Sequence, residues 1–522
     1  MSETVRNYTG SGGPSRNAGW QPRGGCLRQV AVASFILLVA LLWLTRDTND
    51  VAEFMPAGLR YNVVLADPVN SRERVLKSAV WNAWPDAASR ERVLEALRKD
   101  PGLPQWVMNN LVTERLYLLG SDVRDFSDML AITRMSRIGT LLEKFHRISG
   151  GVTSDYAGGL RLRHAADGSI YYAVRGRVLL ISTSRESLIR SLTLAPDTAV
   201  DEATHAELAR DGVEDFRGTV ELAEDDPLGD AFQSIAFAVR IDADKAYAKC
   251  HAIIRESARP RFGPLLNGAK PLPLEEPLPG PIELSANFGK PVREVWASLG
   301  EALQSSVINA AQWQTWESGG EAGVPTNAQA ITNMLGPLGP SIRLSFTGID
   351  VNEMVPAPTI VGTFATPQGV VPALDKLPPP PADAKPWDSY PRYDAEAKLA
   401  HMPLIGGPSL EPTAMLAGRQ LVISSSRSAA ESLVKAMPAA ATMPEEANLF
   451  IRVRPKPVVE EVTAALRLFA EVGMLRGYTL EEFDDASGTW AASAARVSEV
   501  VVIASGVENS IDAELRVLCP PQ

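Results

Sequence analysis

The spacing of hydrophobic residues predicts one long apolar segment near the N-terminus, followed by many short strands and amphipathic helices. Val30–Leu44 is an unbroken apolar run between Arg28 and Arg46. Further along, apolar and polar residues alternate over short segments bounded by Gly, Pro, Asn or Asp, which is typical of strands. The turns between them are short, which favours antiparallel or mixed sheets over a doubly wound parallel sheet. We therefore predict an α+β fold.

The N-terminal segment also predicts a membrane topology. Residues 1–29 are rich in Gly and Ser and carry four arginines against Glu3, so we expect a disordered cytoplasmic tail. A cleaved signal peptide is disfavoured because no small-residue cleavage pattern follows the apolar run, and a lipoprotein is disfavoured because Cys26 precedes it. We therefore expect residues 30–45 to be an uncleaved transmembrane signal anchor that crosses the inner (cytoplasmic) membrane once. The bulk of the chain then lies in the periplasm or exterior, as in a bacterial envelope protein.

An internal repeat is the second strong pattern. Residues 172–192 and 414–437 share a Gly-Arg turn, a short apolar strand, a Ser-Arg pair and a helix. Gly176 and Gly418 predict tight turns between two strands, because glycine tolerates the backbone conformation that such turns need. Capping-box spacing predicts where the two helices begin: Thr183 with Glu186 in the first copy, and Ser428 with Glu431 in the second.

Two weaker matches extend the repeat along the chain. Residues 115–123 match residues 343–351, with Gly120 aligned to Gly348. A strand followed by an amphipathic helix is predicted in three places: Tyr61–Val80, Ile235–Ile254 and Leu449–Leu468. The order of these units predicts two homologous α+β domains, with a Pro-rich connector between them and C-terminal strands that complete the second domain. Their bounds are 50–260 for the first domain, 261–282 for the connector, 283–470 for the second domain and 471–522 for the C-terminal strands.

Two segments carry a resemblance to a known family. After the anchor comes the run Met55-Pro56-Ala57-Gly58-Leu59-Arg60-Tyr61-Asn62-Val63, and later the run ISTSRESL at residues 181–188. The pattern resembles an uncharacterised family of bacterial membrane-anchored exterior proteins with duplicated domains, known only as a domain of unknown function. The resemblance implies the architecture above and supplies no activity, cofactor or catalytic residue.

The composition of the chain restricts the classes of partner that it can bind. The chain has 51 Lys and Arg against 62 Asp and Glu, a net charge of −11, which argues against nucleic acid as a partner. Hydrophobic residues make up 45% of it, enough for a buried core. Beyond the anchor, the only cysteines are Cys250 and Cys519, which either form one disulfide or stay free.

Familiar catalytic and metal-binding motifs are missing from the sequence. The five histidines form no metal-binding pair, and there is no C-x-x-C, phosphate-binding loop or nucleophile elbow, so we predict no metal, cofactor or catalytic residue. Ser432 and Lys435 match S-x-x-K, the acylating motif of penicillin-binding enzymes. Its partner motifs S-D-N and K-T-G are absent, so we do not assign these residues a catalytic role. One speculative feature remains: at each of the two repeated helix starts, backbone N–H groups, a hydroxyl and an arginine could bind an anion. Its residues are Ser184, Arg185, Ser426 and Arg427; plain helix capping is the alternative explanation.

These patterns predict a non-enzymatic, single-pass, membrane-anchored envelope protein with a structural or protein-interaction role. Its partners would be other envelope proteins or a second copy of the chain. Two alternatives stay open: binding of a lipid, peptide or other apolar ligand in an inter-domain groove, and a hydrolase whose dispersed residues leave no local motif.

Overall fold

The computed structural model describes a large part of the chain. It covers residues 49–83, 105–113, 115–124, 126–149, 153–157, 160–164, 170–210, 212–226, 228–262, 280–287, 341–351, 356–365, 392–404, 408–418, 420–436, 448–475 and 479–520, with residues 35, 45, 47, 338, 374, 382, 383 and 385. The tail at 1–29, most of the anchor at 30–45 and most of the connector at 261–282 lie outside these residues. Within the described part, no helix is both long and apolar enough to cross a membrane.

Twenty strands of the described part join in one sheet, in which every pairing is antiparallel. This confirms the predicted α+β class and the antiparallel pairing. In spatial order the strands are β4 (Thr153–Ala157), β5 (Leu160–His164), β6 (Tyr171–Arg175), β7 (Val178–Ser182), β3 (Leu130–Arg134), β2 (Arg115–Gly120), β1 (Tyr61–Ala66), β8 (Phe216–Glu221), β9 (Phe232–Ile241), β10 (Lys245–Ile254), β20 (Ser510–Leu518), β19 (Glu499–Val507), β18 (Leu449–Val453), β11 (Ile282–Asn287), β12 (Ser341–Asp350), β13 (Ala357–Ala365), β17 (Gln420–Ser424), β16 (Thr413–Ala417), β15 (Leu399–His401) and β14 (Arg392–Asp394).

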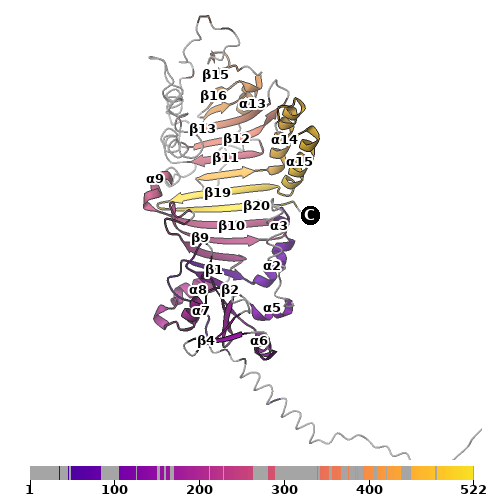
Figure 1. Ribbon diagram of the computed structural model, residues 1–522. Coiled ribbons are helices and arrows are strands. Elements are labelled where there is room, and N and C mark those ends of the chain that lie inside the picture. Colours follow the sequence, from indigo (N-terminus) through magenta and orange to yellow (C-terminus); the bar gives the residue numbers. More distant parts are fainter. Residues whose placement is uncertain are drawn as a thin grey trace, which may run out of the picture.

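The strand order repeats about the β10–β20 pair, which we call the join (Figure 1). Outward from β10, the chain places β9, β8, β1, β2, β3, β7, β6, β5 and β4. Outward from β20, it places β19, β18, β11, β12, β13, β17, β16, β15 and β14 in the matching positions. Strand β10 begins at Lys245, and strand β20 begins at Ser510. Lys249 is four residues beyond the start of β10, and Glu514 is four residues beyond the start of β20. These two residues pair with each other, so a pseudo-twofold axis passes between them.

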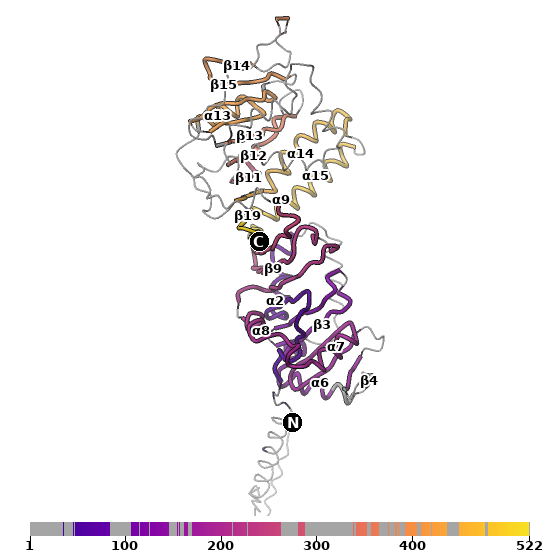
Figure 2. Tube along the Cα trace, turned by 90° about the vertical axis from the view of Figure 1, so that its left-hand side faces the viewer, coloured from indigo at the N-terminus to yellow at the C-terminus, as the bar shows by residue number. Residues whose placement is uncertain are grey.

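Helices flank the sheet along its length, and the molecule is elongated in the direction in which the strands stack (Figures 1 and 2). In Figure 1, α2, α3, α5, α14 and α15 lie along the right-hand margin of the sheet, whereas α7, α8 and α9 lie on its left. The α-helices are α2 (Pro68–Lys77), α3 (Ala79–Asn82), α5 (Gln105–Leu111), α6 (Arg137–Ser149), α7 (Arg185–Leu192), α8 (Glu202–Ala209), α9 (Arg259–Phe262), α13 (Arg427–Ala436), α14 (Pro455–Glu471) and α15 (Leu480–Ala494). Short 3-10 helices are η1 (Ala52–Phe54), η2 (Pro196–Thr198), η3 (Glu256–Ala258) and η5 (Pro408–Leu410).

One row of cross-strand partners crosses the sheet on a single face, because residues directly opposite each other in an antiparallel pair point to the same side. We call this side the core face. From β6 to β10 the row reads Ala173, Leu180, Ile132, Tyr117, Val64, Arg217, Ala238 and Lys249. From β20 to β16 it continues Glu514, Ile503, Phe450, Ser285, Arg343, Thr363, Val422 and Met415.

The core face is apolar in the first half of the sheet. Leu180, Ile132, Tyr117 and Val64 are all buried, and they belong to one cluster that also contains Leu188 of α7. The cluster gains stability from removal of this apolar surface from water. Burial also raises the pKa of the Tyr117 phenol above its ordinary value, so Tyr117 is neutral at physiological pH.

The matching strands of the second half carry charged and hydroxylated residues on that face. Glu283 of β11 is bonded on both sides, by Arg343 Nη2 at 2.7 Å and by Arg452 Nη2 at 2.6 Å. Arg343 Nε also donates to Ser285 Oγ at 3.3 Å. The side chains of Glu283 and Arg343 are 3% and 7% exposed, so this is a buried ion triad and not a surface salt bridge.

The repeated turns follow the sequence prediction, but the predicted helix starts are wrong by one or two residues. Gly176 and Gly418 have φ of +58° and +59°, the left-handed region that favours glycine. Helix α7 is capped by Ser184, whose side chain accepts from Ser187 N at 3.2 Å. Thr183 lies one residue before this cap, and its hydroxyl donates to Ser127 O at 2.9 Å. In the second copy α13 begins at Arg427, ahead of the predicted Ser428.

The segment Ile235–Ile254 is two strands, so the helix predicted there is wrong. The strands β9 and β10 pair with each other along their whole length. The run Lys245–Ile254 alternates large polar with small or apolar residues, the period of a strand. Tyr61–Val80 and Leu449–Leu468 do contain a strand followed by a helix, as predicted.

Cys250 and Cys519 are free thiols. Cys250 lies within β10 and pairs with Ala513, whereas the backbone N–H of Cys519 donates to Asp244 O at 2.7 Å, just before β10 begins. The two cysteines are therefore six residues, or about 20 Å, apart along the strand direction, at ~3.4 Å per residue. This is far beyond the reach of a disulfide.

Candidate functional site

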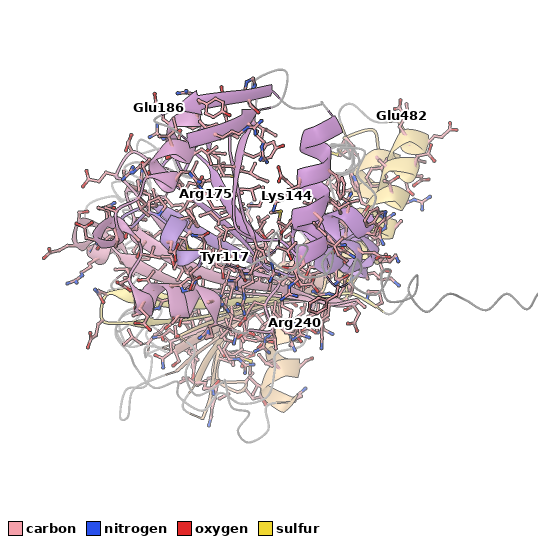
Figure 3. All side chains as sticks on the ribbon, turned by 90° about the horizontal axis from the view of Figure 1, so that it is seen from below. Tyr117, Lys144, Arg175, Glu186, Arg240 and Glu482 are labelled. Carbon is pink, nitrogen blue, oxygen red and sulfur yellow. The ribbon has the colours of Figure 1, made fainter. Side chains whose placement is uncertain are left out.

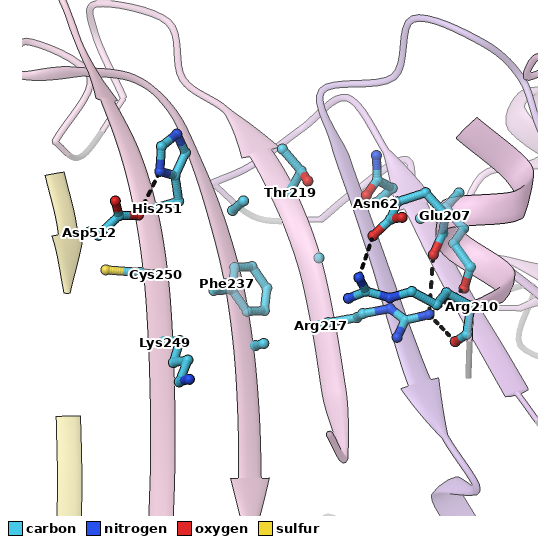
Figure 4. Close-up of a pocket in the computed structure, with 14 residues that line it drawn as sticks. Asn62, Glu207, Arg210, Arg217, Thr219, Phe237, Lys249, Cys250, His251 and Asp512 are labelled. Atoms are coloured by element: carbon cyan, nitrogen blue, oxygen red, sulfur yellow. Dashed lines mark hydrogen bonds and ion pairs between the residues drawn. The ribbon is translucent and has the colours of Figure 1, made fainter. Parts of the chain in front are cut away.

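A trough of about 300 Å³ lies on the core face beside the join (Figure 4). Its floor is made of small residues, Ala236 and Ala238 of β9 with Thr219 of β8. On the matching strands across the join, the row positions of Arg217 and Ala238 are held by Phe450 and Ile503. The hollow therefore lies where the sequence has alanine in place of a large apolar side chain.

Arginine 217 builds one wall of the trough by fixing α8 to the sheet. Its Nη2 donates to Glu207 O at 3.2 Å and to Leu208 O at 3.1 Å, and it also reaches Arg210 O. These carbonyls lie at and just beyond the C-terminal end of α8, where a helix has too few backbone N–H groups to satisfy its last carbonyls. The guanidinium is only 14% exposed, so it acts mainly as a structural brace that leaves one cationic edge at the trough.

The opposite wall comes from the two strands of the join. Lys249 and His251 of β10 face Glu514 and Asp512 of β20, with Lys249 Nζ 3.9 Å from Glu514 Oε2 and His251 Nδ1 2.7 Å from Asp512 Oδ1. Arg516 bonds to Glu514 as well, and this bond lowers the pKa of the Glu514 carboxyl. Glu514 is therefore ionised at neutral pH, and it attracts Lys249 across the join.

The trough does not assemble the groups that nucleophilic catalysis needs. Cys250 and His251 are consecutive residues of a strand and point to opposite faces. Burial raises the pKa of the Cys250 thiol, so the thiolate is disfavoured at neutral pH. Among the described residues, no group of three or more His, Cys, Asp or Glu is placed to hold a metal ion.

The residues of the speculative anion site lie far apart. Ser184 and Arg185 follow β7, and Ser426 and Arg427 follow β17, with twelve strands between these two strands, or roughly 60 Å at ~4.8 Å per strand. They cannot form one site. Each copy could still bind an anion by itself, and for the first copy this stays a prediction.

The second copy is poorly suited to an anion. Arg427 Nε donates to Glu431 Oε1 at 2.9 Å, and its Nη2 donates to Asp394 Oδ2 at 3.2 Å. These carboxylates raise the pKa of Arg427, and the backbone N–H of Ala397, together with the arginine, lowers the pKa of Asp394. Ser426 is buried and bonded to Ser428 Oγ at 2.9 Å. Arg427 thus pairs with carboxylates of its own chain, and the capping explanation fits this copy better.

Sequence reasoning missed the trough because its residues come from distant segments. His251 and Asp512 are 261 positions apart, and only the register of the β10–β20 pair brings them together. The alternation of Lys245, Tyr247, Lys249 and His251 was the available signal. The helix predicted for this segment concealed it, because residues two apart do not share a helical face.

Comparison with known proteins adds little to this description. No family model matches the chain, and no curated protein sequence matches it. Similar solved structures include two titled "Structure of crystal form I of TP0453" and "Structure of crystal form III of TP0453". The first has a TM-score of 0.25 and 10% identity, covering 40% of this chain and 80% of the other; the second has a TM-score of 0.25 and 8% identity, covering 44% and 90%. A likeness at this level carries no argument about function.

Proposed function

We propose that this protein is a non-enzymatic, single-pass envelope protein that binds another envelope protein at the trough. In this proposal residues 30–45 are the membrane anchor, and the two homologous α+β domains are the halves of the sheet. The repeated strand order about Lys249 and Glu514 supports the duplication. The resemblance to membrane-anchored exterior proteins with duplicated domains is consistent with both the membrane anchor and the duplication.

The trough is the observation that carries the binding role. It is open, it lies in the first half beside the join, and it offers small residues as a floor with cationic groups on both walls: Arg217 and Arg210 on one side, Lys249 on the other. Glu207 and Asp512 lie among them, so a largely apolar floor is bordered by charged groups of both signs. Such a lining fits a protein segment with small apolar and charged side chains better than it fits a lipid tail, which would lie against the charged groups.

Filling the trough tests this proposal. The variant Ala238→Trp places an indole on the floor, and Val472→Trp, at a position 68% exposed in the second half, is the matched control. We expect native mass spectrometry of gently extracted wild type to show co-purifying protein subunits. These should be retained in Val472→Trp and lost in Ala238→Trp. Unfolding midpoints of the two variants check that both fold.

Other results would point elsewhere. An added mass of a few hundred daltons in place of a subunit would favour the small-ligand alternative. A clean multiple of the 56.2 kDa chain, abolished by Ala238→Trp, would identify a second copy as the partner. A bare monomer would overturn the proposal, and an activity screen for a hydrolase would then be the next experiment.

A further inference from the structure

An exposed apolar patch lies at the outer end of the first half. Ile138 and Phe145 are 55% and 67% exposed, and they are seven residues apart on α6, so they share one helical face. Trp106 of α5 is 55% exposed and Tyr156 of β4 is 66% exposed. We call these four residues the outer-end patch. Large apolar groups that gather at one end of a molecule mark an interaction surface more often than scattered ones do.

Close contacts hold the helices of the patch together. The side-chain Nδ2 of Asn110 donates to Trp106 O at 2.6 Å, and Ser136 Oγ donates to Asn110 Oδ1 at 2.6 Å. Gly139 allows this approach, because a Cβ there would lie 2.0 Å from Asn110 O. The buried pair of Glu143 with Arg163 fixes α6 to β5. The apolar side chains are therefore presented by a rigid support.

The segment that connects the predicted anchor to the sheet lies beside this patch. Asp47 Oδ2 lies 3.1 Å from Arg134 Nη2 and 3.4 Å from Arg177 Nη1. Arg177 Nε donates to Met135 O at 2.8 Å, two residues before α6 begins. Asp47 is only two residues beyond the expected end of the membrane span at Thr45, so at most about 7 Å of chain separates them. A span at 30–45 would thus place α6 close to the membrane surface.

Charge at this end matches an anionic bilayer. Residues 137–192, which include α6, β4 to β7 and α7, carry nine Lys and Arg but four Asp and Glu, in a chain of net charge −11. Figure 3 views the molecule from this end, with Lys144 of α6 and Arg175 of β6 labelled. Basic residues around exposed aromatic and aliphatic groups are typical of surfaces that lie in the headgroup region of a membrane.

We propose that the outer-end patch is a second membrane contact, which inserts into the headgroup region of a bilayer with anionic phospholipid beside the anchor. This inference rests on the proposed membrane anchoring. The anchor alone would leave the long sheet free to tilt. The patch would fix its orientation, so that the trough is held at a defined height above the membrane.

Spin-label accessibility tests the proposal on the full chain in liposomes that contain anionic phosphatidylglycerol. A nitroxide is placed at Phe145→Cys or, as the control, at Met474→Cys, which is 70% exposed in the second half; the native cysteines are changed to serine. We expect the label at 145 to collide with lipid-soluble oxygen and to lose access to a water-soluble relaxer. The label at 474 should show the reverse. Replacing Arg137 and Lys144 with glutamine should partly restore water access at 145.

Flotation of the same liposomes separates this inference from the anchoring that it rests on. If the chain floats with the vesicles while the label at 145 is as accessible to water as the label at 474, the anchor stands and the patch contact is wrong. If the chain does not float, anchoring and patch contact are both wrong. Loss of the lipid signal in the variant Ile138→Asp, with flotation retained, would further support the contact.

Discussion

Replacing Glu283 with alanine is expected to lower the free energy of unfolding by about 3–5 kcal/mol, because it removes the carboxylate that Arg343 and Arg452 share inside the protein. The cost arises mainly from the guanidiniums that stay buried after their counter-charge has gone. Urea unfolding of the full chain in detergent, followed by circular dichroism, measures it.

Two further variants make this prediction specific. Glu460→Ala removes a glutamate of an exposed i,i+4 pair with Lys456, and should change stability by about 0–1 kcal/mol. Replacing the whole triad by Leu at 283 and 343 and Met at 452 should be near neutral, since an apolar set of similar volume needs no counter-charge. An unfolding midpoint for Glu283→Ala equal to that of Glu460→Ala would show that the triad is not coupled to folding.

Ile132→Ala is expected to cost about 2–5 kcal/mol through the cavity that it leaves in the first half. Ile132 is fully buried on β3, between the row partners Tyr117 and Leu180. Ile360→Ala is the matched control: this isoleucine is on β13, is 47% exposed, and should change stability by no more than about 0.5 kcal/mol. Equal midpoints for the two variants would contradict the assignment of the core to this face.

The two predictions concern the same face of one sheet, on which the two halves bury different kinds of side chain. Ile132 and Tyr117 in the first half correspond to Thr363 and Arg343 in the second. The first half excludes water with apolar packing, whereas the second combines an ion triad and hydroxyls with a smaller apolar cluster that includes Val361 and Val422. Since both halves belong to one sheet through β10 and β20, each variant should shift a common unfolding transition.

Local patterns in the sequence were sufficient to predict much of this fold. The Gly176 and Gly418 turns, the strands before α7 and α13, and the C-terminal hairpin β19–β20 depend on residues close in sequence, whose backbone preferences act locally. The 172–192 and 414–437 match is also consistent with the register of the sheet, which places Leu180 and Val422 at corresponding positions.

The long-range register could not be derived in the same way. The sequence match aligned Arg115 with Arg343, whereas the row of partners places Tyr117 at the position that corresponds to Arg343. A shift of two residues preserves the face of a strand, so hydrophobic alternation cannot detect it. A bulge in β12 between Phe346 and Gly348 also shifts the register of this strand against β13. The trough depends on another long-range register, that of β10 with β20, and so its residues could not be predicted either.

The continuous sheet would have a mechanical consequence if the protein is anchored at one end, as we propose. Nineteen steps between neighbouring strands, at ~4.8 Å each, give a length of roughly 90 Å along the sheet. A pull along this length acts across the strands, and it would open their hydrogen bonds one after another, as in a zipper, instead of loading them together in shear. The molecule is thus weak under tension and better suited to act as a spacer than as a tether. Its terminal strands, β14 and β4, are short, which discourages the addition of further chains at either edge and sets a fixed length.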